Sequence, residues 1–208
     1  TWNGGTDMLL RATEYILDDP DAAEVPVKEG VTWSGFKQIA KLDGRVHAAA
    51  PVDLAGDGKL ALYIANASGD RLFKYDSKAK ELLDVTKAVK LASKSKVSAW
   101  GDFKADGMMD LLSWDGEGLT IHTQSADGSF QAGEQLLKGA LANDCLALVS
   151  LDCGKKGAPG VVISTKTSPL LWKADAPQSA TPIGGAFAGA ALGAPGLCLL
   201  ADLDGDAL

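Results

Sequence analysis

The chain has 208 residues, 46% of them hydrophobic, which is enough to bury a sizeable core. Its net charge is −7, and the 20 basic residues are scattered in ones and twos, so the composition argues against a nucleic-acid partner. The most apolar stretch, residues 183–200, is diluted by Gly, Ala and Pro, which argues against a membrane span.

Short apolar runs bounded by Gly and Asp predict β-strands along the chain. Near the N-terminus, residues 8–18 follow a loop and favour a strand over a helix. Further along, Asp-Gly and Gly-Asp turns separate the apolar runs at the positions that hairpins require. The strands expected from these runs are 60–65, 71–75, 82–85, 97–100, 111–114, 119–123 and 129–132. The sequence therefore predicts an all-β fold.

An aspartate-rich loop recurs at a fixed period. It begins at Asp53, Asp102, Asp152 and Asp202, in steps of 49, 50 and 50 residues, and residues 3–8 match the second half of the same unit. The loops span residues 3–8, 53–61, 102–110, 152–160 and 202–208. About four short strands in every 50 residues are typical of β-propeller blades, in which each small sheet buries its faces against its neighbours. Residues 1–208 are therefore predicted to form a single propeller region.

These motifs resemble the FG-GAP or VCBS repeats of integrin-α-like β-propellers, whose loop reads D-x-D-x-D-G-x-x-D. Two further segments are similar to family phrases: LLDVTKAVKL at 82–91 and ADGSF at 126–130. The resemblance covers nearly the whole chain and implies four four-stranded repeats of about 50 residues. It favours part of a seven- or eight-bladed ring, completed by further blades or another chain, over a closed ring of four. An incomplete ring predicts that the isolated chain aggregates or self-associates.

The resemblance also implies calcium, because the family's loop supplies ligands at its first, third, fifth and ninth positions. The 202–208 loop has the best run of carboxylates and the 102–110 loop the next best. In the latter, Lys104 occupies the third position, where its ammonium cannot ligate a metal but could act as an internal cation among the carboxylates. The predicted metal ligands are Asp202, Asp204, Asp206, Asp102, Asp106 and Asp110.

The other two loops lack most of the required side chains. The 53–61 loop has Ala55 and Ala61 at its third and ninth positions, and the 152–160 loop keeps only Asp152. Aspartate side chains cap tight turns by accepting backbone N–H groups without any metal. These two loops are therefore predicted to be metal-free turns.

The histidines, tryptophans and cysteines are assigned structural roles. His122 lies in an alternating run and is expected on a solvated face. Trp100, Trp114 and Trp172 are expected to wedge between sheets. The three cysteines lack the paired spacing of a zinc site and are expected to be structural thiols.

Two classes of function follow. The favoured one is a non-catalytic platform that binds a protein or glycan through its propeller loops, in an extracellular, cell-surface or periplasmic protein. This location comes from the resemblance and the calcium-type loops, since no signal peptide is visible. The alternative is the propeller part of a secreted polysaccharide-degrading or other hydrolase or lyase. Its only candidate residues are His47, Lys96 and the loop aspartates, because no known catalytic motif is present.

Overall fold

The computed structural model describes residues 6–15, 34–137, 141, 144–151 and 159–183, with side chains from residue 41 onward. Throughout this part of the chain the regular secondary structure is β-strand, and no helix is present. The chain divides into two units, Thr1–Arg45 and Val46–Leu208, which are described separately. In the described residues no helix is long and apolar enough to cross a membrane.

The first unit contains one antiparallel pair of strands. Strand β1 (Thr6–Tyr15) pairs with β2 (Ser34–Asp43), starting from Thr6 opposite Asp43. The register shifts between Leu9 and Leu10 and again between Ala12 and Glu14, so the pairing contains two irregularities. The strand predicted at residues 8–18 is confirmed in its first part, and residues 16–18 lie outside the described residues.

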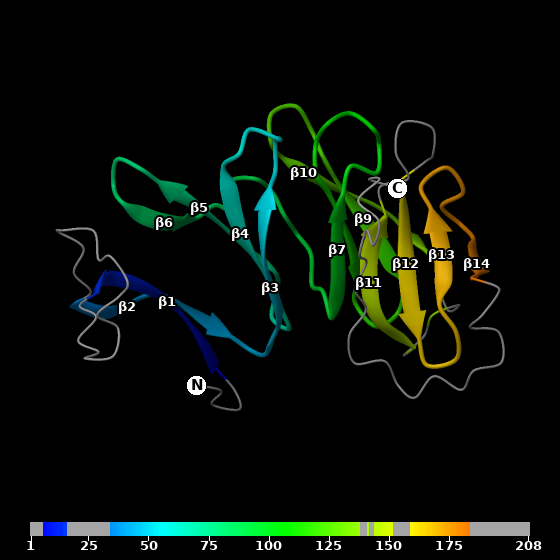
Figure 1. Cartoon of the computed structure of the whole chain (residues 1–208), viewed down its shortest axis with the longest axis horizontal. Helices are drawn as coiled ribbons and strands as arrows, with labels where there is room; N and C mark the ends of the chain where they lie inside the picture. The colour runs from blue at the N-terminus through cyan, green and yellow to red at the C-terminus, as the bar shows by residue number, and fades with distance from the viewer. Residues whose placement is uncertain (1–5, 16–33, 138–140, 142–143, 152–158, 184–208) are drawn as a thin grey trace, which may run out of the picture. The chain divides into compact units, whose positions relative to one another are not determined.

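The second unit contains three four-stranded antiparallel sheets (Figure 1). The first sheet consists of β3 (Val46–Asp53), β4 (Leu60–Asn66), β5 (Arg71–Asp76) and β6 (Glu81–Asp84). The second consists of β7 (Val97–Gly101), β8 (Asp110–Trp114), β9 (Leu119–Gln124) and β10 (Phe130–Leu136). The third consists of β11 (Cys145–Leu151), β12 (Gly160–Thr165), β13 (Leu170–Lys173) and β14 (Ala180–Pro182).

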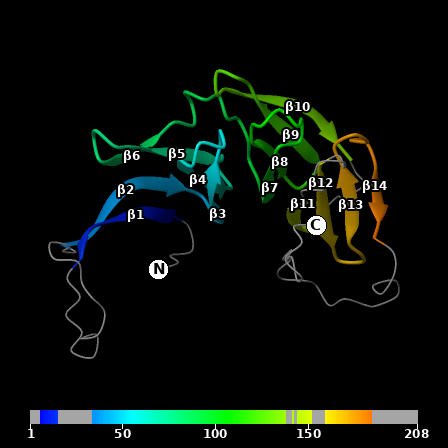
Figure 2. The same ribbon diagram turned by 45° about the horizontal axis from the view of Figure 1, so that its top comes forward.

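Each sheet is a simple meander in which consecutive strands are hydrogen-bonded neighbours. Figure 2 shows the three sheets following one another along the chain. Strand β7 contacts both β3 and β11, so the first strands of successive sheets are adjacent. Four strands per repeat were predicted from the sequence, and these three sheets confirm that order.

Two hydrophobic clusters join the sheets. One lies between the first and second sheets and includes Tyr63 and Leu72 from the first and Leu111 and Phe130 from the second. The other lies between the second and third sheets, where the indole of Trp172 is completely buried. Because apolar side chains of neighbouring sheets share each cluster, each repeat is stabilised in part by burial against its neighbours.

The tryptophans expected to wedge between sheets do so. Trp100 of the second sheet makes edge-to-face contact with Tyr63 of the first, with ring centroids 5.1 Å apart. Trp172 of the third sheet contacts Phe103 in the same way at 5.6 Å and donates its indole N–H to the carbonyl oxygen of Pro177 at 3.0 Å. Trp114 is also buried between the second and third sheets. The prediction for these three side chains is confirmed.

Candidate functional site

The loops at 53–61 and 102–110 adopt the same backbone turn. The Asp53 carboxylate accepts backbone N–H groups four and five residues later, at 3.1 and 2.8 Å. The Asp102 carboxylate accepts the corresponding two groups at 3.0 and 2.7 Å. Gly58 and Gly107 follow with φ of 78° and 83°, a left-handed conformation that favours glycine. The first aspartate of each loop therefore closes the turn by itself, as was predicted for the 53–61 loop.

The second residue of each loop anchors the turn in a hydrophobic cluster. Leu54 is 3% exposed and lies in the cluster shared by the first and second sheets. Phe103, at the equivalent position one repeat later, is 6% exposed and lies in the cluster shared by the second and third sheets. The aspartate cap and the apolar side chain after it thus hold the start of each loop, and this fixes the backbone that carries the other aspartates.

The fifth-position aspartates, Asp57 and Asp106, each pair with a lysine of the same loop. The Asp57 carboxylate lies 2.6 Å from Lys59 Nζ, and the hydrogen bond from this ammonium lowers the pKa of Asp57. The Asp106 carboxylate lies 3.0 Å from Lys104 Nζ, which lowers the pKa of Asp106 in the same way. Both loops therefore already carry a cation at this position.

Lys104 reaches further into its loop than Lys59 does. Its Nζ donates to the carbonyl oxygen of Gln124 at 2.8 Å and lies 3.9 Å from Oδ1 of Asp110. Asp110 is completely buried, and its Oδ1 accepts the backbone N–H of Gln124 at 2.8 Å. The hydrogen bond to Asp106 is the main reason that the pKa of Lys104 is raised, and the charge of Asp110 adds to it.

Three of the six predicted calcium ligands lie in the 102–110 loop. Asp102, Asp106 and Asp110 share this loop. Oδ2 of Asp110 is buried without a hydrogen-bond partner, and the other carboxylate oxygens face backbone N–H groups or the Lys104 ammonium. The Lys104 ammonium occupies part of this loop without supplying any of the six to eight oxygens that a calcium ion requires. In the part of the chain that the structure describes, no group of three or more His, Cys, Asp or Glu side chains is placed to hold a metal ion.

Three of the predicted loops fall wholly or partly outside the described residues. Asp202, Asp204 and Asp206 lie outside the described residues, so calcium at the 202–208 loop remains a prediction. Residues 3–5 of the first loop and 152–158 of the fourth loop also lie outside the described residues. The metal-free turn expected at 152–160 therefore remains a prediction as well.

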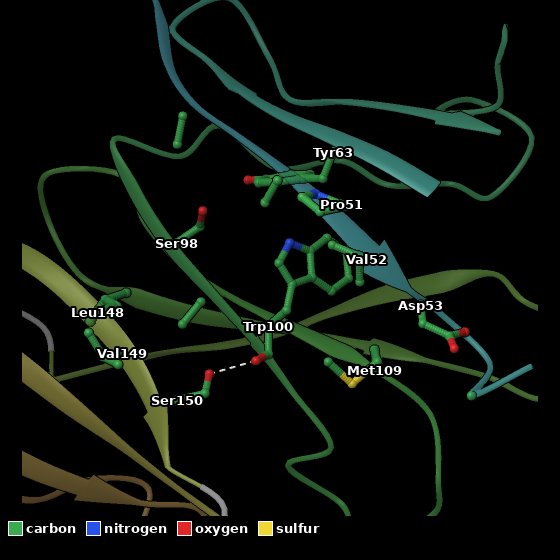
Figure 3. Close-up of a pocket in the computed structure, with 14 residues that line it drawn as sticks. Pro51, Val52, Asp53, Tyr63, Ser98, Trp100, Met109, Leu148, Val149 and Ser150 are labelled. Atoms are coloured by element: carbon green, nitrogen blue, oxygen red, sulfur yellow. Dashed lines mark hydrogen bonds between the residues drawn. The ribbon is translucent and has the colours of Figure 1, made fainter. Parts of the chain in front are cut away.

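A pocket of about 660 Å³ lies where the first strands of the three sheets meet (Figure 3). We call it the first-strand pocket. Equivalent positions of successive repeats line it: Ala50 and Pro51 from β3, Ala99 and Trp100 from β7, and Val149 and Ser150 from β11. Its volume lies within the range typical of small-ligand sites, about 300 to 1,000 Å³.

Trp100 distinguishes this pocket from a simple product of the repeat. The equivalent residues one repeat earlier and later are Pro51 and Ser150, so the repeat itself does not require a large aromatic side chain here. In Figure 3 the half-buried indole stands at the centre of the pocket, with Pro51, Val52 and Met109 around it. The Ser150 hydroxyl donates to the Trp100 carbonyl oxygen at 2.6 Å, which fixes β7 against β11.

Asp53 and Gly56 of the 53–61 loop also line the first-strand pocket, as does Met109 of the next loop. The pocket therefore combines a largely apolar lining with Asp53, whose carboxylate caps the turn of its own loop. This arrangement suits contact with a ligand that has an apolar surface, and it offers no nucleophile paired with a base.

Two of the enzyme candidates proposed from the sequence, His47 and Lys96, lie outside the first-strand pocket. His47 is the second residue of β3 and does not line the first-strand pocket. The Lys96 ammonium lies over the ring of Trp114, 5.6 Å from its centroid, which is a cation–π contact. Lys96 thus packs against an aromatic ring instead of joining the loop aspartates.

The prediction that His122 lies on a solvated face was wrong. His122 is 4% exposed, and its Nε2 is hydrogen-bonded to the Ser113 hydroxyl at 3.1 Å. It pairs across the sheet with Leu111, which belongs to the cluster shared with the first sheet. Alternate residues of the same strand face the third sheet, as Leu119 does. Because neighbouring sheets cover both faces, alternation in β9 does not separate core from solvent.

A buried polar network joins the first sheet to the segment that leads into the second. The Asp70 carboxylate accepts the hydroxyls of Tyr63 and Ser95 at 2.8 and 2.5 Å, and the backbone N–H groups of Asn66 and Ser95 at 3.0 Å each. Burial, together with the charge of Asp70, raises the pKa of Tyr63, so its hydroxyl stays a donor. The sequence analysis missed this network, since Asp70 looked like an ordinary turn residue.

Comparisons with known proteins add no assignment. No protein-family model matches the chain, and a search of curated proteins found no significant match. The site must therefore be interpreted from its own geometry.

Proposed function

We propose that this chain forms part of a β-propeller and acts as a non-catalytic binding or assembly platform in an extracellular, cell-surface or periplasmic protein. One observation carries the proposal: three four-stranded meanders recur in register with the Asp loops, their first strands are adjacent, and hydrophobic clusters join each sheet to the next. This arrangement is expected for blades around an axis. The resemblance to FG-GAP or VCBS repeats supports the same proposal.

In this proposal the sheets provide a rigid support and the loops provide recognition. The caps on Asp53 and Asp102 and the anchors at Leu54 and Phe103 hold two loops in defined conformations. Recognition surfaces are commonly built from loops that a rigid scaffold positions in this way. The partner would be a protein or glycan that contacts several loops, with Trp100 in the first-strand pocket as an apolar contact point.

Further blades, from the same protein or another chain, would complete the ring, because propellers have about four to eight blades. Without them the outermost sheets would expose apolar faces. Calcium at Asp202, Asp204 and Asp206 would stiffen the last loop. Size-exclusion chromatography with light scattering tests the first point: we expect the 208-residue chain to self-associate, and a monodisperse, cooperatively unfolding monomer would count against an open ring.

The binding role is tested with an array of glycans and a panel of purified extracellular-matrix proteins. We expect binding to at least one of these probes, and we expect Trp100→Ala to weaken it at least tenfold. Tyr75→Ala is the matched control, because Tyr75 is 56% exposed and does not line the first-strand pocket. Release of new reducing ends or unsaturated sugars from polysaccharides by the purified chain would instead favour the enzyme alternative and contradict a non-catalytic platform.

A further inference from the structure

We infer that Lys104 is the resident cation of the 102–110 loop and takes the place that a calcium ion has in loops of this type. Its ammonium contacts three acceptors that surround the turn: Asp106 at 3.0 Å, Asp110 at 3.9 Å and the Gln124 carbonyl oxygen at 2.8 Å. The last of these belongs to β9, so the ammonium ties the loop between β7 and β8 to a third strand of the same sheet.

The charges of the loop explain why it needs a cation. Asp110 is completely buried, and a buried carboxylate is strongly destabilising unless a counter-charge or hydrogen bonds compensate it. One of its oxygens accepts the Gln124 N–H, whereas Oδ2 is buried without a hydrogen-bond partner. Lys104 supplies a positive charge 3.9 Å from this carboxylate. The same ammonium also pairs with the exposed carboxylate of Asp106 at 3.0 Å.

The same contacts leave no room for a divalent ion. Calcium must lie about 2.3 to 2.6 Å from each of several oxygens, including those of the carboxylates that Lys104 now contacts. An ammonium already at hydrogen-bonding distance from Asp106 would repel a second cation placed there. Lys104 also donates to a neutral carbonyl oxygen of β9, so moving its side chain aside would break this hydrogen bond between the loop and the sheet.

The 53–61 loop provides a control within the same chain. Its turn is closed in the same way, and Lys59 lies 2.6 Å from Asp57. However, the Lys59 side chain is 85% exposed, and Ala61 replaces the buried carboxylate of the ninth position. An exposed pair of this kind contributes little to stability. Lys104 is therefore the resident cation of its loop, whereas Lys59 belongs to a surface ion pair.

The first experiment introduces the missing calcium ligand. Lys104→Asp is made together with Asp202→Ala, which removes the response of the last loop and so keeps this test independent of calcium there. Thermal unfolding is recorded in EDTA and in millimolar Ca²⁺, and calcium binding is measured by titration calorimetry. We expect no calcium response from Asp202→Ala alone, and from the double variant a rise of about 3 to 8 °C in the unfolding midpoint with one bound ion.

The second experiment removes the ammonium without adding a ligand. We expect Lys104→Met to lower the unfolding midpoint by roughly 3 to 6 °C in EDTA, because the buried Asp110 loses its counter-charge. Lys59→Met should change it by less than about 1 °C.

Two results would overturn the inference. One is equal effects of Lys104→Met and Lys59→Met. The other is a calcium response in the Asp202→Ala chain that disappears with Asp106→Asn, since this would show that the loop binds metal while Lys104 is present. If Lys104→Asp does not fold in either buffer, the comparison of the two methionine variants decides.

Discussion

Replacing Tyr63 with phenylalanine tests whether the buried Asp70 network holds the first two sheets together. The side chain is fully buried, and its hydroxyl donates to Asp70 at 2.8 Å and lies 3.0 Å from the Ser95 hydroxyl. Tyr63→Phe keeps the ring and its apolar contacts and removes only this hydroxyl. A hydrogen bond to a charged group contributes about 1.5 to 3 kcal/mol, so we expect a loss of about 2 kcal/mol in the free energy of unfolding.

This loss corresponds to a decrease of roughly 4 to 8 °C in the unfolding midpoint of a domain of this size. The loss in the free energy of unfolding is measured by urea denaturation, followed by tryptophan fluorescence and circular dichroism. Tyr75→Phe is the control, because the Tyr75 side chain is 56% exposed and should change the free energy by less than about 0.5 kcal/mol. Equal effects of the two substitutions would refute the argument that the Tyr63 hydroxyl stabilises the network.

Three further predictions concern other buried groups. Trp172→Ala should cost about 3 to 5 kcal/mol in urea denaturation, because it empties a fully buried site and removes the hydrogen bond to Pro177; a loss below about 1 kcal/mol would contradict this packing. Burial lowers the pKa of His122 in the folded chain, so the imidazole binds a proton more readily in the unfolded chain. The free energy of unfolding should therefore decrease as pH falls below about 6.5, and it should decrease less steeply in His122→Asn. Burial raises the pKa of Cys145 to about 12, so mass spectrometry should find this thiol unalkylated by iodoacetamide at pH 8 until the chain is denatured.

The strands of the second sheet show what local sequence can predict. The ranges expected at 97–100 and 111–114 correspond to β7 (Val97–Gly101) and β8 (Asp110–Trp114), each within one residue at either end. The prediction succeeds because the Asp-rich loop between them is a strong turn signal: its first aspartate caps the turn, and Gly107 adopts a left-handed conformation. Both effects act within a few residues and are visible in the sequence.

The contacts of Lys104 were predictable only in part. The spacing of the loop placed this lysine among Asp102, Asp106 and Asp110, and the structure shows its ammonium near the last two of them. Its third partner, the carbonyl oxygen of Gln124, lies 20 residues further along the chain. No periodic signal connects these two positions, because their contact depends on how β9 pairs with β8.

The sequence by itself determined the class of secondary structure, the repeat of 49 to 50 residues and the turns between strands, because these depend on local backbone preferences and on short-range capping. The tertiary structure alone decided which side chains meet between sheets. His122 is buried and Asp70 collects hydrogen bonds from the segment before β7 because a neighbouring sheet covers that face. A strand pattern assigns a residue to one of two faces, and only the packing of sheets decides whether that face meets water or another sheet.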